Sequence, residues 1–339
     1  MTTANETLRS REIRLASRPN GEPTGDNFAV ATAEVGPPGE GEILVKNTLM
    51  SVEPYMRGRM NDAKSYVPPF VVGEALSGAA IGTVVASRVP EIPVGATVLH
   101  DQGWREFAIV PAKSARVIDT THVPPETYLG ALGTTGFTAW VGLRIIAEVK
   151  EGQTVFVSGA AGAVGSMAVQ LAKRWGLRVI GSASSPEKAR VVREEFGADA
   201  AFDYHDGAYK QLRTLAPDGI DVYFDNVGGE QLEAAISATR NHARIVLCGA
   251  VSQYNAAAPP PGPRNLAIAI GRRLRLQGFI VIDHLARFRE YVAEVAPLVA
   301  SGALRAPTTF VDGLDNAPAA FMQMLKPNAS VGKIVVRLG

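Results

Sequence analysis

Three glycines, at positions 159, 162 and 165, lie in the run VSGAAGAVGSMAVQLAK of residues 157–173. The preceding run, TVFVSG, is rich in β-branched residues and is typical of a buried strand. A helix is expected from Val164 to Trp175, with one apolar face made of Val164, Ala168, Leu171, Ala172 and Trp175. A strand, a tight glycine turn and a helix start form a loop in which the backbone can approach a phosphate closely.

The helix N-terminus would add free N–H groups and a partial positive charge to this loop. The dinucleotide fingerprint G-x-G-x-x-G would place its first glycine at 160, where this chain has alanine, so the match is A-x-G-x-x-G. An ordinary strand-to-helix turn is the alternative. Because a strand precedes the loop and a helix follows it, we favour a dinucleotide site.

The end of the second strand indicates which dinucleotide binds. NAD sites usually carry an acidic residue there, which bonds the ribose 2′-OH. Here the strand LRVIG runs into SASSPEK, and Gly181 and Ser182 take the place of the acid. Hydroxyl groups and Lys188 follow, and together they can bind a 2′-phosphate. The pattern favours NADPH; the alternative for Lys188 is a surface lysine at a helix start.

The order of elements predicts how this loop is held. Residues 1 to about 125 contain short apolar runs separated by glycine and proline, which is typical of strands joined by turns. From about residue 127, strand-like runs alternate with helical patterns, and this alternation predicts βαβ units and a parallel sheet with helices on both faces. The expected strands are TVFVSG, LRVIGSA, DVYFDNVGG, ARIVLCGAV and LRLQGFIVI, with helices near 187–196 and 284–300. A short helix near 316–325 and a last strand, GKIVVRL, are expected to return to the first domain.

Composition excludes several classes of protein. A chain of 339 residues predicts two domains. With 34 basic and 33 acidic residues the net charge is +1, so no nucleic-acid partner is expected. No run approaches the ~20 apolar residues of a membrane span, and the N-terminal run has no apolar core of a signal peptide, so a cytoplasmic location is expected. The single cysteine, Cys248, excludes internal disulfides and is predicted to be a buried strand residue, not a nucleophile.

Several motifs in a fixed order carry a family resemblance. They are SVEPYMRGRM (51–60), LGTTGFTAW (132–140), VSGAAGAVG, FDNVGGE (224–230) and CGAVSQYN (248–255). With them the chain resembles the zinc-independent medium-chain dehydrogenase/reductases, in the branch of the leukotriene B4 12-hydroxydehydrogenase/prostaglandin reductases, plant double-bond reductases and bacterial curcumin reductase. The resemblance implies an α/β fold in which a Rossmann-type, doubly wound parallel sheet is inserted into a GroES-like β-barrel catalytic domain. The implied domains are 1–126, 127–300 and 301–339, and the implied assembly is a homodimer.

The catalytic metal site of the zinc-containing relatives is missing from this sequence. Those relatives carry a Gly-His-Glu segment, whereas this chain reads VVGEALSG, with Gly73-Glu74 and no histidine. The five histidines are dispersed and lack the spacing of metal ligands. We therefore expect a metal-free enzyme.

The resemblance implies NADPH-dependent reduction of the C=C bond of an α,β-unsaturated ketone or aldehyde. Hydride transfer to the β-carbon leaves an enolate, whose oxygen needs a donor and whose α-carbon needs a proton. Tyr254 matches a tyrosine proposed as that donor in similar enzymes; the alternatives are a tyrosine that contacts the cofactor without moving a proton, and donation by the cofactor ribose. Tyr55 resembles a substrate-pocket tyrosine, or else it packs between domains.

The resemblance also implies a set of cofactor contacts. Lys188 matches the lysine that takes the 2′-phosphate, Tyr204 a tyrosine near the phosphates, and Asn226 an asparagine near the nicotinamide, although Asn226 also suits a simple turn. In the C-terminal motif, NASVGK, Ser330 holds the aligned place and Asn328 lies two residues earlier. The full expected set is Gly159, Ala161, Gly162, Ala163, Val164, Gly165, Ser182, Lys188, Tyr204, Asn226, Thr135, Thr138, Cys248, Gly249, Ser252, Tyr254, Phe279, and Asn328 or Ser330.

Two other functions stay open from the sequence. The first is an NADPH quinone oxidoreductase, a sister branch with a similar fold and glycine loop. The second is a non-catalytic, crystallin-like NADPH-binding protein. Alcohol oxidation is disfavoured because a simple alcohol would lack its usual zinc activator.

Overall fold

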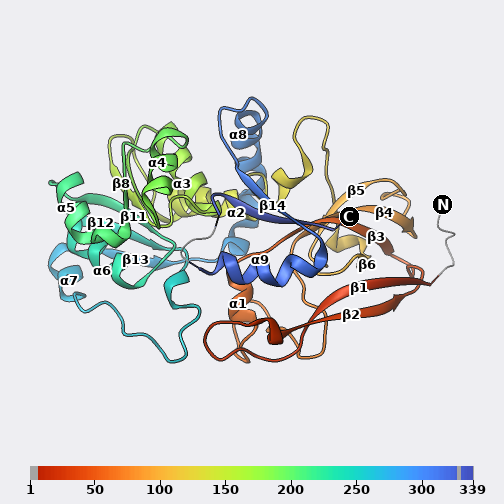
Figure 1. Ribbon diagram of the computed structural model, residues 1–339. Helices are drawn as coiled ribbons and strands as arrows, with labels where there is room; N and C mark the ends of the chain where they lie inside the picture. Colours follow the sequence, from red (N-terminus) through yellow and green to blue (C-terminus); the bar gives the residue numbers. More distant parts are fainter. Residues whose placement is uncertain (1–6, 327–329, 339) are drawn as a thin grey trace. The chain divides into compact units, whose positions relative to one another are not determined.

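The computed structural model describes residues 7–326 and 330–338, and within them the chain forms two compact units (Figure 1). One unit consists of residues 130–307 and 330–333, and the other of residues 7–129, 308–326 and 334–338. The sequence predicts domain boundaries after residues 126 and 300, and in the structure the units divide after residues 129 and 307. The short piece 330–333, which joins the first of these units, was not expected.

The unit that contains the N-terminal part is built on antiparallel strands. Its larger sheet has the order β14 (Thr308–Asp312), β15 (Lys333–Arg337), β3 (Glu42–Ser51), β4 (Ala80–Ser87), β5 (Thr97–His100) and β7 (Arg116–Val117), and β6 (Phe107–Pro111) also pairs with β3. A separate ribbon joins β1 (Leu8–Leu15) to β2 (Phe28–Val35). Its helices are α1 (Tyr55–Arg59) and α9 (Ala317–Met324), with short turns η1 (Gly25–Asn27), η2 (Ala112–Ser114), η3 (Pro125–Leu129) and η8 (Leu314–Asn316).

The other unit contains a six-stranded parallel sheet. Its order is β10 (Ala200–Asp203), β9 (Arg178–Ala183), β8 (Thr154–Val157), β11 (Ile220–Asp225), β12 (Thr239–Leu247) and β13 (Arg275–Gly278). The chain winds outward from β8 in one direction and then returns to β11 to wind the other way. The predicted doubly wound α/β fold is therefore confirmed, and its switch point lies between β8 and β11.

Helices surround this sheet (Figure 1). They are α2 (Thr134–Trp140), α3 (Ala163–Arg174), α4 (Pro186–Glu194), α5 (Ala208–Leu215), α6 (Gly229–Ala238), α7 (Ala267–Arg272) and α8 (Phe288–Ala300), with a π-helical turn η4 (Val141–Ile146) and the short turns η5 (Tyr204–Asp206), η6 (Val251–Gln253) and η7 (Val281–Arg287).

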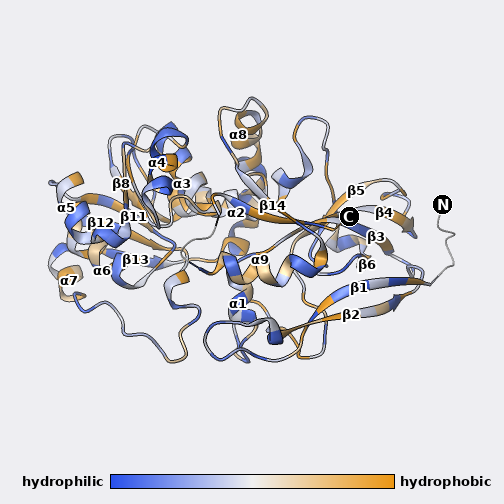
Figure 2. Ribbon diagram, viewed as in Figure 1, coloured by the Kyte–Doolittle hydropathy of each residue, from blue (hydrophilic) through white to orange (hydrophobic). Residues whose placement is uncertain are grey.

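Both faces of the parallel sheet are buried. Tyr223 packs with α5 and α6 in one hydrophobic cluster, whereas a Cβ on Gly142 of η4 would lie 2.5 Å from the ring of Phe224. Successive strand residues point to opposite faces, so these two contacts lie on opposite sides of β11. Figure 2 shows hydrophilic and hydrophobic residues alternating along helices such as α4 and α8, as expected for helices with one face against a core.

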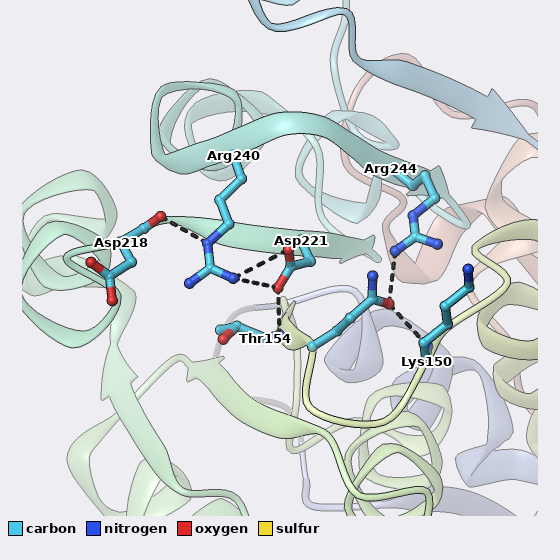
Figure 3. Close-up of polar contacts among 7 residues, drawn as sticks. Lys150, Thr154, Asp218, Asp221, Arg240 and Arg244 are labelled. Carbon is cyan, nitrogen blue, oxygen red and sulfur yellow. Dashed lines mark hydrogen bonds and ion pairs between the residues drawn. The ribbon is translucent and has the colours of Figure 1, made fainter.

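Polar contacts tie together the amino ends of the central strands (Figure 3). Asp221 of β11 accepts a hydrogen bond from the backbone N–H of Thr154 at 2.8 Å and pairs with Arg240 of β12 at 3.1 Å. Arg244 and the backbone N–H of Lys150 both donate to the side-chain oxygen of Gln153. These bonds fix the register of β8, β11 and β12 at the edge opposite the glycine loop.

Two local expectations are corrected by the structure, and one strand was not expected at all. The helix expected near 284–300 is divided into η7 and α8, which begins at Phe288. The strand expected to contain Cys248 ends at Leu247, so Cys248 begins the following loop and is only half-buried. Strand β10 was not anticipated, because its sequence AAFD is short and starts with two alanines, which favour helices.

Candidate functional site

The glycine loop connects β8 to α3 as predicted, at the carboxyl edge of the sheet. Gly159 has φ +57°, a conformation that side chains disfavour. Gly162 is the N-cap of α3, and no side chain caps this helix. The first N–H groups of α3, which include those of Ala163 and Val164, therefore lack a side-chain acceptor and are available to an anion.

Gly165 allows the helix to approach the loop. A Cβ at this position would lie 2.2 Å from the carbonyl oxygen of Gly159 and 2.8 Å from Cα of Ala160. The position where the fingerprint lacks glycine, Ala160, is fully buried. Its methyl group is accommodated by Gly181 of β9, where a Cβ would lie 2.9 Å from that of Ala160. Glycine at 181 therefore leaves room for the methyl group of Ala160.

Packing thus explains why residue 181 is glycine, and it also explains the environment of Ser182. Ser182 is 0% exposed, and its hydroxyl donates to Oε1 of Gln231 on α6 at 2.5 Å. Its carbonyl accepts the N–H of Ala160 at 2.9 Å. The structure therefore places the Ser182 side chain in the core, where the residue supports the glycine loop, and not at the surface of the site.

The residues that follow β9 and β10 come together. Ala183 pairs with Asp203, so Ser184 and Tyr204 leave neighbouring parallel strands at the same level. Lys188, on the first turn of α4, lies with its Nζ 3.2 Å from the Ser184 hydroxyl. Burial lowers the pKa of Lys188 from the ordinary lysine value and raises the pKa of Tyr204, which Asp203 raises further.

On the other side of β8, Asn226 follows β11. Its side-chain Nδ2 donates to the carbonyl of Ser158 at 2.7 Å, and its backbone N–H donates to the Ser158 hydroxyl at 3.0 Å. The neighbouring Asp225 is buried, and its side chain accepts four hydrogen bonds. Sequence reasoning missed Ser158, Tyr223 and Asp225 as supports of this site, although the motif FDNVGGE contains Asp225.

The loop after β12 lies against the turn at Asn226. The backbone N–H groups of Cys248 and Gly249 both donate to the carbonyl of Asp225 at 2.9 Å, and the exposed Ser252 donates its hydroxyl to the carbonyl of Val227 at 2.6 Å. Burial, with a contribution from Asp225, raises the pKa of the Cys248 thiol to about 12. The expectation that Cys248 is not a nucleophile agrees with this value.

Tyr254 lies at the end of the same loop. Its phenol oxygen accepts the backbone N–H of Ala250 at 3.3 Å, and a Cβ on Gly249 would lie 3.3 Å from that oxygen. Burial raises the pKa of Tyr254 above its ordinary value, with smaller contributions from Cys248 and Asp225. The phenol is therefore neutral at pH 7 and retains a proton to donate.

The segment 330–333 runs beside the glycine loop. Gly332 donates its N–H to the carbonyl of Ala161 at 2.8 Å and forms a bridge with Gly162. The hydroxyl of Ser330 is buried, with no hydrogen-bond partner among the described residues. Asn328, the alternative to Ser330, lies outside the described residues.

The remaining expected residues are distributed over the two units. Thr135 and Thr138 lie on α2, where Thr135 is buried and Thr138 donates to the carbonyl of Thr134 at 2.7 Å. Phe279 follows β13 and is near Gly142 of η4. Tyr55 belongs to the other unit, at the start of α1, where burial and the charge of Glu53 raise its pKa.

These features fit a dinucleotide on three independent observations. Within the part of the chain that the structure describes, the N-terminus of α3 has no side-chain cap and the buried hydroxyl of Ser330 beside the glycine loop has no hydrogen-bond partner. The loop itself brings its backbone close to the surface without bulky side chains. The carboxyl edge of the sheet at a switch point is also where folds of this kind bind ligands. Gly162, Ala163, Val164 and Ser330 would hold the diphosphate region, and Lys188 with Ser184 the adenosine end.

Comparison with known proteins decides the family. Residues 11–118 match the family described as the N-terminal domain of oxidoreductase, and residues 163–300 match the family described as zinc-binding dehydrogenase. The chain is 39% identical to the NADPH-dependent curcumin reductase of Escherichia coli, with 97% of each chain covered. It is 35% identical to the NADP(+)-dependent 2-alkenal reductase of Nicotiana tabacum, with 98% of each covered. The chain belongs to the medium-chain dehydrogenase/reductase superfamily, in the branch of the prostaglandin, alkenal and curcumin reductases.

A solved structure of this branch agrees with the fold. The crystal structure of CurA from Vibrio vulnificus in complex with NADPH superposes with a TM-score of 0.92 at 39% identity, covering 97% of this chain and 99% of CurA. Although one matched family is described as zinc-binding, the described part of this medium-chain reductase contains no group of three or more His, Cys, Asp or Glu residues that could hold a metal ion. In that same part of the chain, no helix is long and apolar enough to cross a membrane.

Proposed function

We propose that this protein is an NADPH-dependent reductase of the C=C bond of α,β-unsaturated ketones and aldehydes. The observation that carries the choice of cofactor is the contact of Lys188 with Ser184 just after β9, a strand that ends in RVIGSA without a carboxylate. A lysine and a hydroxyl favour a 2′-phosphate, and a missing carboxylate removes repulsion. The substrate class is supported by the identity to curcumin and 2-alkenal reductases over nearly the whole chain.

NADPH, when bound, supplies the hydride that is added to the β-carbon of the substrate. The π pair of the C=C bond then forms the double bond between the α-carbon and the carbonyl carbon, and the π pair of the carbonyl moves onto its oxygen to give an enolate. Protonation of the α-carbon, from water or a protein hydroxyl, restores the carbonyl and completes the reduction. Tyr254 is assigned the hydrogen bond to the developing enolate oxygen. Its neutral phenol can donate to that oxygen, and a donor aimed at a developing oxyanion contributes several kcal/mol of barrier lowering, roughly 3 kcal/mol.

Other side chains of this chain are assigned to binding. Lys188 and Ser184 select the 2′-phosphate, the N-terminus of α3 binds the diphosphate, and Asn226 holds the nicotinamide side. Tyr204, Thr135, Thr138 and Phe279 are proposed as further contacts. Tyr55 is proposed to contact the substrate.

The test is a matched panel of substrates. NADPH oxidation is followed with an open-chain enone, a 2-alkenal, a quinone and a saturated aldehyde, with NADH in parallel, and the products are identified by mass and NMR. We expect rapid NADPH-dependent formation of the saturated ketone or aldehyde with its carbonyl intact. A preference for the quinone would favour the quinone oxidoreductase reading, and tight NADPH binding without turnover would favour a binding protein.

A further inference from the structure

Asp225 gathers four hydrogen-bond donors on one carboxylate oxygen. This residue ends β11 and is 1% exposed. Its Oδ1 accepts the phenol of Tyr223 at 2.7 Å, the hydroxyl of Ser158 at 3.3 Å, and the backbone N–H groups of Val227 and Gly228 at 2.9 and 2.8 Å. One atom therefore holds the end of β8, the end of β11 and the turn that leads into α6.

The number of protons on these groups decides which of them donates and which accepts. A carboxylate can only accept, so the single proton of Tyr223 is donated to Asp225. The phenol oxygen of Tyr223 lies 2.9 Å from the hydroxyl of Ser158, so Ser158 shares its single proton between this oxygen and Oδ1 of Asp225. The free lone pair of Ser158 then accepts the backbone N–H of Asn226 at 3.0 Å. Asp225 thus acts on Asn226 through two hydroxyl groups.

The side-chain orientation of Asn226 follows from the same strand end. The carbonyl of Ser158 accepts a hydrogen bond from this side chain at 2.7 Å, so the atom facing it must be Nδ2. The amide oxygen, Oδ1, is then the atom that points away. Among residues 7–326 and 330–338, no group donates a hydrogen bond to Oδ1, and the residue is half-buried. Asn226 therefore presents an acceptor at the carboxyl edge of the sheet.

We propose that Asp225 is a positioning residue: through Tyr223 and Ser158 it fixes Asn226 so that Oδ1 accepts a hydrogen bond from the nicotinamide-bearing half of the cofactor. This inference rests on the proposed function. Lys188 follows β9, the glycine loop follows β8, and Asn226 follows β11, so the three lie in the order of neighbouring strands. Strands are about 4.8 Å apart, which places Asn226 about 10 Å beyond the 2′-phosphate end. The cofactor group that bonds Oδ1 of Asn226 is therefore a hydrogen-bond donor, either a hydroxyl or an amide N–H.

Two ligands separate this role from general loosening of the fold. NADPH carries both halves of the cofactor, whereas adenosine 2′,5′-bisphosphate carries the 2′-phosphate without the nicotinamide half. Binding is measured with purified full-length protein, by NADPH fluorescence and by calorimetry. Tyr223→Phe removes the donor to Asp225, and Ser158→Ala removes the acceptor of the Asn226 N–H. For both variants we expect the Kd of NADPH to rise about fivefold, and that of the bisphosphate to change less than about twofold.

A matched control and a conservative variant complete the design. Thr239→Val removes a buried hydroxyl from the amino end of β12, where it donates to the carbonyl of Ile236 at 2.8 Å. It should lower the melting temperature and leave both Kd values unchanged. Asp225→Asn keeps an Oδ1 acceptor for the same donors and should retain NADPH affinity within about threefold of the unaltered protein. Asp225→Ala leaves four buried donors unsatisfied and threatens folding, so the hydroxyl variants decide.

Each outcome is informative. Weakened binding of NADPH alone supports the positioning role of Asp225. Unchanged NADPH binding in Tyr223→Phe and Ser158→Ala, or an equal loss for both ligands, overturns it. If the unaltered protein binds the bisphosphate and NADPH no better than NADH, the proposed cofactor itself is wrong, and this failure is distinguishable from the others.

Discussion

Lys188 is the residue on which the choice between NADPH and NADH depends. It lies at the start of α4, with Nζ 3.2 Å from the hydroxyl of Ser184. Lys188→Ala should raise the KM for NADPH about tenfold, because a charge-assisted bond to a phosphate is lost, and should change the KM for NADH less than about twofold. Initial rates with both cofactors measure this. Arg190→Ala removes an equal charge from the exposed side of the same helix and is the control. Equal effects of Lys188→Ala on both cofactors would contradict the assignment.

The pH dependence of this preference follows from the burial of Lys188. Burial lowers the pKa of the ammonium below 10.5, the ordinary value. The charged form is therefore lost as the pH rises through this lowered pKa. The KM for NADH divided by the KM for NADPH should therefore fall as the pH rises. The fall should begin at a lower pH than it would if this lysine were exposed. Lys188→Arg, whose guanidinium does not titrate in this range, should hold the ratio constant; a fall of the same size in this variant would rule out Lys188 as its source.

Tyr254 carries the prediction about chemistry. Because burial raises its pKa, the phenol stays protonated through neutral and mildly alkaline pH and remains a donor. Tyr254→Phe should lower kcat for an enone by roughly 10- to 100-fold, and should leave the Kd of NADPH nearly unchanged. Single-turnover rates with deuterated NADPH show whether hydride transfer limits the rate. Tyr209→Phe, at an exposed position on α5, is the control. An unchanged rate of the chemical step would transfer the role to a ribose hydroxyl or water.

At the scale of elements, the loop between β8 and α3 depends on Gly165. A methyl group there would lie 2.2 Å from the Gly159 carbonyl oxygen, so the loop or the helix must move. Gly165→Ala should weaken NADPH binding at least about tenfold and destabilise the fold by roughly 1 to 3 kcal/mol. Fluorescence titration and thermal unfolding measure the two effects. Gly262→Ala, at a site with no atom within 4 Å of the new methyl group, should change neither; an equally tolerated Gly165→Ala would remove the steric argument.

The same elements show what sequence could predict. The glycine loop and the alternation of strands and helices were recognisable, because both depend on local residue types and on periodicity. The packing of Ala160 against Gly181 was not recognisable, since the two residues meet only when β8 and β9 pair. The inward orientation of Ser182 could not be predicted for the same reason. Its hydroxyl bonds Gln231 of α6, which is far away in the sequence.

The supports of the site were the hardest part to predict. Ser158 and Asp225 are distant in sequence, and their contact exists because β8 and β11 are neighbours at the switch point. Nothing in FDNVGGE distinguishes Asp225 from an ordinary turn residue. Similarly, Gly332 meets Ala161 only because the C-terminal segment returns to the parallel-sheet unit before β15 continues in the other.

At the scale of the whole molecule, the β13 edge of the parallel sheet could accept a further strand. β13 pairs with β12 on one side and has no partner strand on the other among the described residues. Large apolar side chains are exposed on the neighbouring elements, namely Leu266, Ile270, Ile282 and Leu285. An open edge strand with apolar residues around it favours association with another sheet edge. We propose that a second copy of this chain pairs the same edge across a two-fold axis, which would be the homodimer expected from the sequence.

Ile270, on α7, is the residue that tests this assembly. It is 81% exposed in the single chain, and burying a side chain of this size contributes about 1.5 to 3 kcal/mol. Ile270→Asp should therefore raise the dimer dissociation constant at least about tenfold, since a carboxylate would be desolvated at the interface. Light scattering after size exclusion, over a range of protein concentrations, measures the mass. Val94→Asp alters a residue that is 63% exposed in the other unit and should leave the mass unchanged. A monomeric unaltered protein, or a dimer that Ile270→Asp leaves intact, would show that this edge is covered in another way.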